Sequence, residues 1–341
     1  MEITTIKDIA KLCGVGVSTV SRAINNHPDI NKETKEMIMQ VIKEHNYIPN
    51  NSARNLKRSN SDTIAVLIKG ISNPFFSSMI KTFEREIKKK KYSFILQRVD
   101  SKEDEIDVAN QLVKEKKLKG IVFLGGYFSH SDEKLGQLKV PFVLSTIGTT
   151  QKLDKTICSS VSVDDFKESY KIVDYLCKLG HKKIAILTPL RDESIGDLRF
   201  NGYISALKDN GIAYDKNLIK YMKDEIDSYS MENGYAVTKE LLQSEEEFTA
   251  IYAICDSIAI GACKAIFDTG KKVPEDYSVA GFDGLDIAHY YNPSITTIRQ
   301  PVEEMAEATI KILFDVIRKK TSAQHKTFPG EFVIGQSTKS I

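Results

Sequence analysis

The chain has 341 residues, of which 41% are hydrophobic and 28% charged, with a net charge of +2; such a composition is ordinary for a folded globular protein of two or three domains. No apolar run approaches the roughly 20 residues of a membrane-spanning helix, and the first ten, MEITTIKDIA, lack the pattern of a secretory signal, so we expect a cytoplasmic protein. The five cysteines include no CxxC pair, which argues against a zinc site or a disulfide framework and predicts reduced thiols.

Charge is unevenly distributed along the chain. Residues 1–60 hold nine Lys and Arg against six Asp and Glu, an excess of three positive charges, so the remaining 281 residues carry a net charge of −1. A basic head on a near-neutral body indicates that only the head meets a polyanion. The excess is modest, so it supports a DNA-binding head without establishing one.

Three short helices are predicted in the head. Thr5 is placed to cap the first, over residues 6–13, and the second is expected over 17–25. Asn31 is placed to cap the third, which runs to His45.

The first two of these helices are spaced as in a helix-turn-helix. That motif needs a small residue on the first helix, a glycine at the turn and a branched apolar residue on the second helix. Ala10, Gly14 and Val20 stand at this spacing, and Gly14 supplies the left-handed backbone conformation that ends a helix sharply. The sequence therefore predicts a headpiece whose second helix enters the major groove of DNA.

Outward-facing side chains of the second helix are the candidates for reading DNA. Arg22 suits a bidentate pair with guanine, Val17 suits a thymine methyl group, and Ser18 suits a base or a phosphate. Hydroxyl groups on this helix also suit phosphates. The predicted DNA contacts of the headpiece are Thr5, Val17, Ser18, Thr19, Ser21, Arg22, Asn25, Tyr47 and Asn50.

Residues 48–61 are polar and basic, and two interpretations stay open for them. One is a flexible linker. The other is a hinge helix over residues 51–57 that forms only on DNA, with an apolar side chain wedged into a base step of the minor groove and basic side chains on phosphates. The second interpretation assigns DNA contacts to Ala53, Arg54, Leu56 and Lys57.

Beyond residue 61, short β-rich runs alternate with amphipathic helices, a pattern typical of parallel sheets covered by helices. The first half predicts strands over 64–68, 93–97, 121–124 and 142–145, and helices over 76–90 and 103–116. After Val161 the pattern repeats, with strands over 184–187, 250–255 and 278–282, and helices over 164–179, 230–243 and 257–269. Two doubly wound α/β lobes follow from this pattern.

Ligands of open α/β sheets bind beyond the carboxyl ends of the strands. The residues just after the predicted strands are therefore candidates for a ligand site between the lobes: Asn73, Phe75, Tyr127, Thr146, Arg199, Asp256 and Asp283. An aromatic ring combined with charged groups suits a sugar or another polyol. Asp256 fits either ligand binding or packing at the strand end, and Phe75 fits either the wall of the site or the core.

Several motifs carry a family resemblance. The run TIKDIAKLCGVGVSTVSRAINNHPDINKETKEMIMQVIKEHNYIPNNSARNLK resembles the headpiece and hinge of the lactose-repressor (LacI/GalR) family. SNPFF (72–76), LGHKKIAIL (179–187), LRFNGYISAL (198–207), residues 255–284 and PSITTIRQP (293–301) resemble motifs of its ligand domain. The resemblance implies a ligand-controlled transcriptional repressor of carbohydrate-utilisation genes, and it singles out Arg199 and Asp283 as ligand contacts.

The resemblance also implies a domain plan. A helix-turn-helix headpiece (1–47) and a hinge (48–61) precede a periplasmic-binding-protein-like core of two doubly wound parallel-sheet subdomains. Because the chain crosses between these subdomains three times, we assign 62–162 plus 292–321 to the first and 163–291 plus 322–341 to the second.

Three positions depart from the family pattern. Gly16 stands where a serine usually caps the recognition helix and touches a phosphate, Cys255 stands where many members have asparagine, and Gly335 stands where arginine is common. The first change puts one phosphate contact in doubt. The other two put parts of the effector pocket or the packing near it in doubt.

Two other classes of protein share parts of the pattern. An enzyme is disfavoured because Gly14-x-Gly16 lacks the third glycine of a dinucleotide fingerprint and follows no strand, and because no GxxxxGK[ST], HExxH or GxSxG motif occurs. A sugar-binding transport protein would need export and no headpiece.

We expect the regulator to bind a pseudo-palindromic operator as a homodimer, because one headpiece contacts too little DNA for useful specificity. We expect a sugar-like effector, and no membrane, cofactor or metal.

Overall fold

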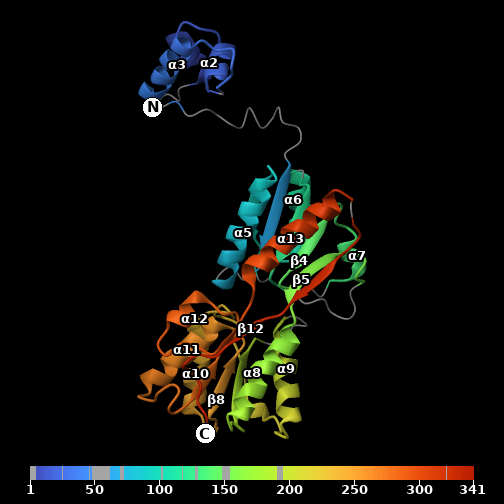
Figure 1. Cartoon of the computed structure of the whole chain (residues 1–341), viewed down its shortest axis with the longest axis vertical. Helices are drawn as coiled ribbons and strands as arrows, with labels where there is room; N and C mark the ends of the chain where they lie inside the picture. Colours follow the sequence, from blue (N-terminus) through green and yellow to red (C-terminus); the bar gives the residue numbers. More distant parts are fainter. Residues whose placement is uncertain are drawn as a thin grey trace. The chain divides into compact units, whose positions relative to one another are not determined.

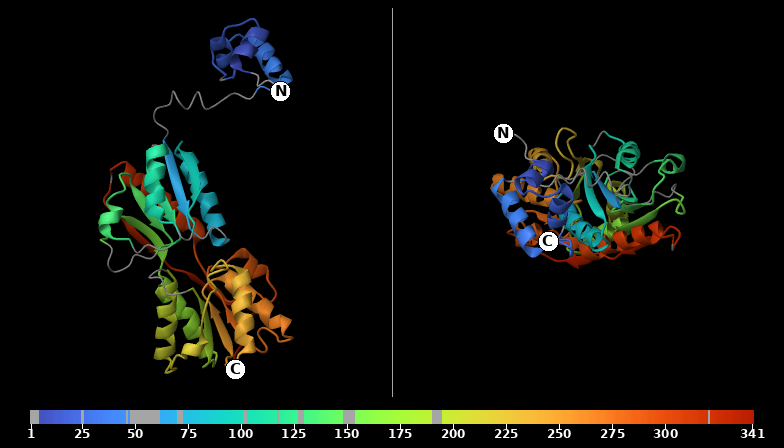
Figure 2. Two further views of the ribbon diagram at one scale, coloured as in Figure 1. Left: turned by 180° about the vertical axis from the view of Figure 1, so that it is seen from behind. Right: turned by 90° about the horizontal axis from the view of Figure 1, so that it is seen from above.

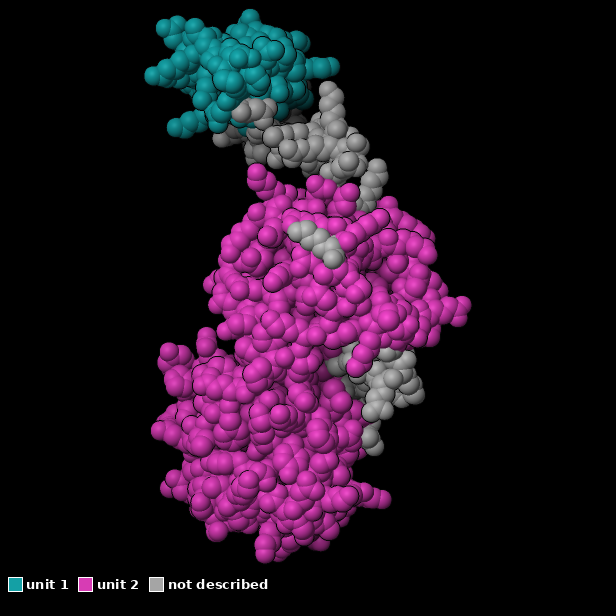
Figure 3. Space-filling view, turned by 45° about the vertical axis from the view of Figure 1, so that its right-hand side comes forward, with its two compact units in different colours: residues 1–60 teal, residues 61–341 magenta. Residues whose placement is uncertain are grey.

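The computed structural model describes residues 5–24, 26–45, 47, 62–69, 73–100, 103–116, 118–126, 130–147, 154–189, 195–319 and 321–341. Figure 1 and Figure 2 show the chain from three directions. It divides into two compact units, residues 1–60 (unit 1) and 61–341 (unit 2), which have different colours in Figure 3.

Unit 1 contains the three predicted helices: α1 (Ile6–Leu12), α2 (Val17–Ile24) and α3 (Lys32–Glu44). Thr5 caps α1 in a reciprocal pair with Asp8, since the Thr5 amide donates to Asp8 Oδ2 at 2.8 Å and the Asp8 amide donates to Thr5 Oγ1 at 3.4 Å. Gly14 follows α1 with a φ of +64°, a conformation that favours glycine. The predicted helices and the turn between the first two are confirmed.

A small apolar core joins the three helices of unit 1. It consists of five buried side chains, which are Ile9, Ala10, Val20, Ala23 and Ile38. Ala10 on α1 and Val20 on α2 both belong to it, as the helix-turn-helix spacing predicts.

The first lobe of unit 2 is a six-stranded parallel sheet in the order β11-β5-β4-β3-β1-β2. Its strands are β1 (Thr63–Ile68), β2 (Ser93–Arg98), β3 (Gly120–Leu124), β4 (Phe142–Ser145), β5 (Ser159–Val163) and β11 (His325–Phe328). One face is covered by α5 (Phe75–Lys89) and α13 (Val302–Ile317), and the other by α6 (Glu105–Lys116) and α7 (Asp132–Leu135).

Strand β1 explains why this sheet is covered on both faces. All six of its residues are buried. Ile64, Val66 and Ile68 join the core beneath α5 and α13, whereas Ala65 and Leu67 join the core beneath α6. A continuous apolar run is what a central parallel strand requires.

The second lobe is a four-stranded parallel sheet in the order β7-β6-β8-β9. Its strands are β6 (Ile184–Thr188), β7 (Ile219–Tyr221), β8 (Ala250–Ala253) and β9 (Ser278–Ala280). Two pairs of helices pack against each other: α8 (Asp165–Lys178) against α9 (Ile195–Asp209), and α10 (Met231–Gln243) against α11 (Asp256–Asp268). The short helices η1 (Lys216–Leu218) and α12 (Asp286–Tyr290) complete the lobe. Glycine allows both helix pairs to pack closely. A β carbon on Gly202 would lie 2.4 Å from the Phe166 carbonyl oxygen, and one on Gly261 would lie 2.0 Å from that of Met231.

The chain passes between the two lobes three times, and two of the predicted boundaries are wrong. Residues 292–299 stay with the second lobe, because the Gly281 amide donates to the Thr296 carbonyl at 2.8 Å and the Asp283 amide donates to the Ile298 carbonyl at 2.9 Å. Residues 325–328 belong to the first lobe rather than the second, because β11 pairs with β5. The chain then crosses back through β12 (Glu331–Val333), which pairs antiparallel with β10 (Thr297–Arg299).

Candidate functional site

The outer face of α2 carries the predicted base-reading side chains. Val20 and Ala23 are fully buried, so the opposite face of this amphipathic helix points to solvent. Val17 is 41% exposed, and Ser18 and Arg22 are also exposed. Val17, Ser18 and Arg22 share the outer side of the helix, which therefore offers both an apolar contact and a bidentate donor.

The other predicted DNA contacts divide into two groups. Thr19 and Ser21 are half-buried on α2, Thr5 caps α1, and Tyr47 is half-buried against the core of unit 1. The remainder lie outside the described residues: Asn25, Asn50, Ala53, Arg54, Leu56 and Lys57.

Gly16 lies just before α2, with its carbonyl accepting from the Thr19 amide at 2.9 Å. A β carbon at Gly16 would meet only Ser18 Oγ at 3.6 Å and Thr19 Oγ1 at 3.9 Å, which are ordinary contacts. The fold of unit 1 therefore leaves room for the serine of the family pattern.

A buried arginine lies at the centre of the predicted ligand site in unit 2. Arg199 on α9 is 4% exposed and donates from Nε to Asp165 Oδ1 at 2.8 Å and from one terminal nitrogen to the Ile254 carbonyl at 2.5 Å. The same terminal nitrogen is 3.6 Å from Asp283 Oδ1, and the guanidinium lies 3.6 Å from the centre of the Phe282 ring. Hydrogen bonds, charge and the ring together hold Arg199 in one orientation.

Asp283 follows β9 in a strained conformation. Its φ is +114°, which few residues other than glycine adopt and which is concentrated at functional sites. Burial raises the pKa of Asp283 to about 6, although Arg199 opposes the shift by stabilising the carboxylate. Gln300 Nε2 donates to Oδ1 at 2.8 Å, whereas Oδ2 has no hydrogen-bond partner among the described residues. This oxygen is therefore an acceptor that a ligand hydroxyl can use.

Both carboxylate oxygens of Asp256, in contrast, already accept hydrogen bonds from within the protein. Oδ1 accepts from Thr297 Oγ1 at 2.7 Å and Oδ2 accepts from the Leu285 amide at 2.7 Å. Burial, with the nearby Asp283 carboxylate, raises its pKa to about 8. Of the two alternatives for Asp256, these contacts favour packing at the strand end.

Three predicted ligand residues lie on the first lobe. Asn73 Oδ1 accepts from the Phe75 amide at 3.0 Å at the start of α5, and the Asn73 side chain is close enough to Asp283 to lower the pKa of that carboxyl. Phe75 is 4% exposed and packs edge-on against Phe76, within the core. Thr146 follows β4 with a φ of +58°, unusual for a β-branched residue. Tyr127 lies outside the described residues.

Two partners in this network were not predicted. Asp165 is the carboxylate that pairs with Arg199, and Gln300 is the amide that pairs with Asp283. Asp165 stands at the start of a helix, where an acidic residue is common, and Gln300 follows a three-residue strand that no periodicity reveals. For Gln300, the only signal in the sequence is its place within the motif PSITTIRQP.

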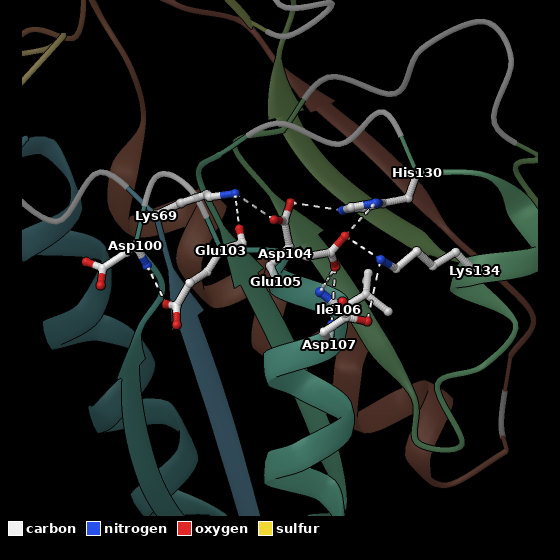
Figure 4. Close-up of polar contacts among 9 residues, drawn as sticks. All are labelled: Lys69, Asp100, Glu103, Asp104, Glu105, Ile106, Asp107, His130 and Lys134. Atoms are coloured by element: carbon white, nitrogen blue, oxygen red, sulfur yellow. Dashed lines mark hydrogen bonds and ion pairs between the residues drawn. The ribbon is translucent and has the colours of Figure 1, made fainter. Parts of the chain in front are cut away.

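A second polar cluster lies at the carboxyl end of the first sheet and was also not predicted (Figure 4). Lys69, just after β1, donates to Glu105 Oε2 at 2.8 Å, and His130 Nε2 is 3.3 Å from Glu105 Oε1. Asp104 accepts from Lys134 and lies 3.7 Å from His130 Nδ1. Hydrogen bonds to His130 and Lys69 hold the pKa of Glu105 below its ordinary value against the effect of burial. These charges satisfy one another and tie the loops after β1, β2 and β3 together.

Comparison with known proteins identifies the family. Residues 5–50 match the family model described as bacterial regulatory proteins, lacI family, and residues 173–338 match the one described as a periplasmic binding protein-like domain. The HTH-type transcriptional regulator MalR of Clostridium butyricum is 43% identical over 330 residues, which cover 96% of this chain and 97% of that protein. The chain belongs to the lacI family of bacterial regulatory proteins. It is a transcriptional regulator, and not an enzyme.

Solved structures of transcriptional regulators share the fold. The transcriptional regulator CelR, in a complex with cellobiose, matches with a TM-score of 0.72 and 25% identity over 98% of this chain and 99% of that one. A LacI family transcriptional regulator from Enterococcus faecium, with bound ribose, matches with a TM-score of 0.71 and 29% identity over 82% of this chain and 100% of that one. The predicted fold class, a helix-turn-helix headpiece with a periplasmic-binding-protein-like core, is confirmed.

Helices long and apolar enough to cross a membrane are absent from the described part of this lacI-family chain. Nor do the described residues contain a group of three or more His, Cys, Asp or Glu side chains placed to hold a metal ion.

Proposed function

We propose that this regulator is a cytoplasmic repressor of carbohydrate-utilisation genes that binds a pseudo-palindromic operator as a homodimer. The observation that carries the proposal is the exposed face of α2, where Val17, Ser18 and Arg22 stand opposite a fully buried face. A helix with this arrangement places its outward side chains at base edges in the major groove. A dimer follows because one such headpiece contacts few bases, and two of them read two half-sites.

The effector in this proposal is a sugar, bound where the network of Arg199, Asp283 and Gln300 meets Asn73. A sugar hydroxyl would donate to Asp283 Oδ2, which has no hydrogen-bond partner among the described residues, whereas Gln300 and Arg199 both lie at Oδ1. Cellobiose and ribose bound to the two similar regulators support this ligand class. A ligand that favours one lobe arrangement would change how strongly the headpieces bind the operator.

The operator-reading role is tested by comparing two variants of the full chain. Arg22→Ala should lose discrimination between the operator and unrelated duplexes, because a bidentate guanine contact accounts for about 1–3 kcal/mol of discrimination. Lys57→Ala should instead weaken binding to all duplexes about equally and lower the salt dependence, as expected for a phosphate contact. Retention of operator preference in Arg22→Ala would remove α2 as the reading helix.

The effector role is tested by thermal shift across a panel of mono- and disaccharides that includes cellobiose and ribose, because a ligand that binds only the folded state raises the melting temperature. Asp283→Asn is the matched variant. Asparagine keeps the acceptor for Gln300 but removes the charge, so the variant should fold and yet lose the shift that the wild type shows. If the variant kept the full shift, Asp283 would have no part in binding the sugar.

A further inference from the structure

One edge of the first lobe collects positive charge from segments far apart in the sequence. In a parallel sheet the strands begin at one edge, and the crossover helices, which run the opposite way, end there. Helices α5, α6 and α13 accordingly end at the edge where β1 begins, as the views from front and back agree (Figure 1, Figure 2). The exposed cations on these ends and on the strand starts, which we term the basic edge, are Lys88–Lys91, Lys114, Lys116, Lys119, Arg318 and Lys319.

Part of this charge is neutralised locally, and part is not. Lys88 pairs with Glu84 and Lys89 with Glu86, each at 2.7 Å. Lys119 is 3.9 Å from Asp62.

Four other lysines of the basic edge, Lys90, Lys91, Lys114 and Lys319, form no ion pair with any described residue. Lysine near a helix C-terminus interacts favourably with the helix dipole, and this accounts for Lys114. This interaction also favours Lys90, which is the C-cap residue of α5, whereas Lys91 and Lys319 lie one residue beyond the C-caps of α5 and α13.

The opposite edge of the same lobe has the reverse character. There the acidic side chains of Asp100, Glu103, Asp104, Glu105 and Asp107 surround Lys69, Lys134 and His130, and most of these charges are paired (Figure 4). The two ends of the lobe therefore differ, because the acidic end is largely paired whereas the basic edge gathers four unpaired lysines. Lys81, Lys311 and Lys326 elsewhere on the lobe also form no ion pair with a described residue. A charge distribution that only kept the protein soluble would not need this difference between the two ends.

The covalent path of the chain indicates which polyanion meets the basic edge. Residues 48–61 connect the headpiece to β1, and β1 begins at this edge with Thr63. Any DNA held by the headpiece is thus tethered to the end of the first lobe that carries the four unpaired lysines of the basic edge. Lysine is a flexible point charge that suits phosphates without reading bases.

We propose that the basic edge binds the phosphate backbone of the DNA that flanks the operator, and so adds affinity that is independent of sequence. The inference rests on the operator binding proposed above. It assigns the reading of the operator to α2 and the holding of the flanking duplex to the first lobe.

The test measures the salt dependence of binding on two duplexes. A duplex selected from a random pool with the full-length protein is used alone, and again with about 15 base pairs of arbitrary sequence added at each end. The basic-edge variant of the full chain carries Lys90→Gln, Lys91→Gln, Lys114→Gln and Lys319→Gln. The control variant removes the same charge from exposed lysines of the second lobe through Lys182→Gln, Lys208→Gln, Lys216→Gln and Lys272→Gln.

The slope of log K against log salt changes by about 0.9 for each phosphate of duplex DNA that the protein no longer neutralises. We expect the basic-edge variant to reduce this slope by about 2 or more on the long duplex and to leave it unchanged on the short one, whereas the control variant keeps the wild-type slope on both. Equal slopes for the two variants on the long duplex would overturn the inference. The inference would also be overturned if the basic-edge variant kept the wild-type slopes on both duplexes but failed to regulate transcription in cells. The basic edge would then bind an acidic protein rather than DNA.

Failure of the inference is distinguishable from failure of the proposed function. Selection of a preferred short duplex by the wild type tests operator reading alone. Unchanged binding of the basic-edge variant to the short duplex shows that the substitutions leave the fold and the headpiece intact. Only the difference between long and short duplexes reports on the basic edge.

Discussion

Replacing Arg199 by alanine should destabilise unit 2 strongly, because the guanidinium neutralises buried carboxylates. Arg199 is 4% exposed, Asp165 is 3% exposed, and their ion pair is 2.8 Å long. Asp283, 3.6 Å from the guanidinium, is equally buried. Alanine would leave both carboxylates without their cation, and the Phe282 ring without the group that covers it.

The magnitude follows from these contacts. Removing one partner of a buried ion pair costs about 3–5 kcal/mol, since the remaining charge stays buried and unpaired. Loss of a desolvated cation–π interaction adds up to about 2 kcal/mol. We therefore expect the free energy of unfolding to fall by about 5 kcal/mol, which is a large part of the stability of an ordinary domain.

Urea unfolding of Arg199→Ala, Asp165→Asn and the double variant tests this reasoning. In the background of Arg199→Ala, Asp165→Asn removes a buried charge that has lost its partner, so the double variant should be more stable than Arg199→Ala alone. The destabilisation of Arg199→Ala should also shrink as the pH falls from 8 to 6. Without Arg199 the folded-state pKa values of Asp165 and Asp283 rise further above the unfolded values, so proton uptake stabilises the fold. A double variant no more stable than Arg199→Ala would refute this account.

Three further predictions concern other parts of the chain. Gly16→Ser should tighten DNA binding about fivefold per headpiece, because one added hydrogen bond to a phosphate contributes about 1 kcal/mol, whereas Gly16→Ala lacks the hydroxyl and should not. Equal DNA affinities for the two variants would count against a phosphate contact at this position. Burial raises the folded-state pKa of Asp256 above its unfolded value, to about 8, so stability should increase by roughly 1.5 kcal/mol as the pH falls from 8 to 6.5, and chemical unfolding of Asp256→Asn should lack this increase. Gly261→Ala should cost about 3 kcal/mol or more, because its β carbon would lie 2.0 Å from the Met231 carbonyl oxygen; an unchanged urea midpoint would contradict the close packing of α10 and α11.

Local features of the fold could be predicted because they depend on neighbours in the chain. The Thr5 cap, the Gly14 turn and the Asn31 cap each involve residues within a few positions of one another. The same holds for β1, β2, β3 and β4 of the first lobe, whose apolar runs are bounded by polar residues. β5 (SSVSV) and β11 (HKTF) lack such runs and were not among the predicted strands. Periodicity was less reliable in the second lobe, where the strand predicted over 250–255 ends at Ala253. The apolar run there continues into the buried helix α11, and periodicity does not separate a buried strand from a buried helix.

The buried polar network around Arg199 was only half predicted, for a reason that Arg199 itself illustrates. Its place in a family motif and its position near a strand end pointed to it, but its partners Asp165 and Asp283 come from other segments of the second lobe. Which carboxylate an arginine meets depends on how the strands and helices pack. Burial likewise decided that Asp256 is fully bonded while Asp283 keeps a free oxygen.

By itself, the sequence determined the headpiece, the alternation of strands and helices, and the family, because these reside in short-range periodicity, caps and motifs. Only the tertiary structure decided that β11 joins the first sheet, that Gln300 reaches Asp283, and that the lysines of the basic edge share one end of a lobe. The physical reason is the same in each case. Parallel strands and crossover helices bring together residues that are distant along the chain, and their neighbours depend on the order of strands in the sheet, which no local pattern encodes.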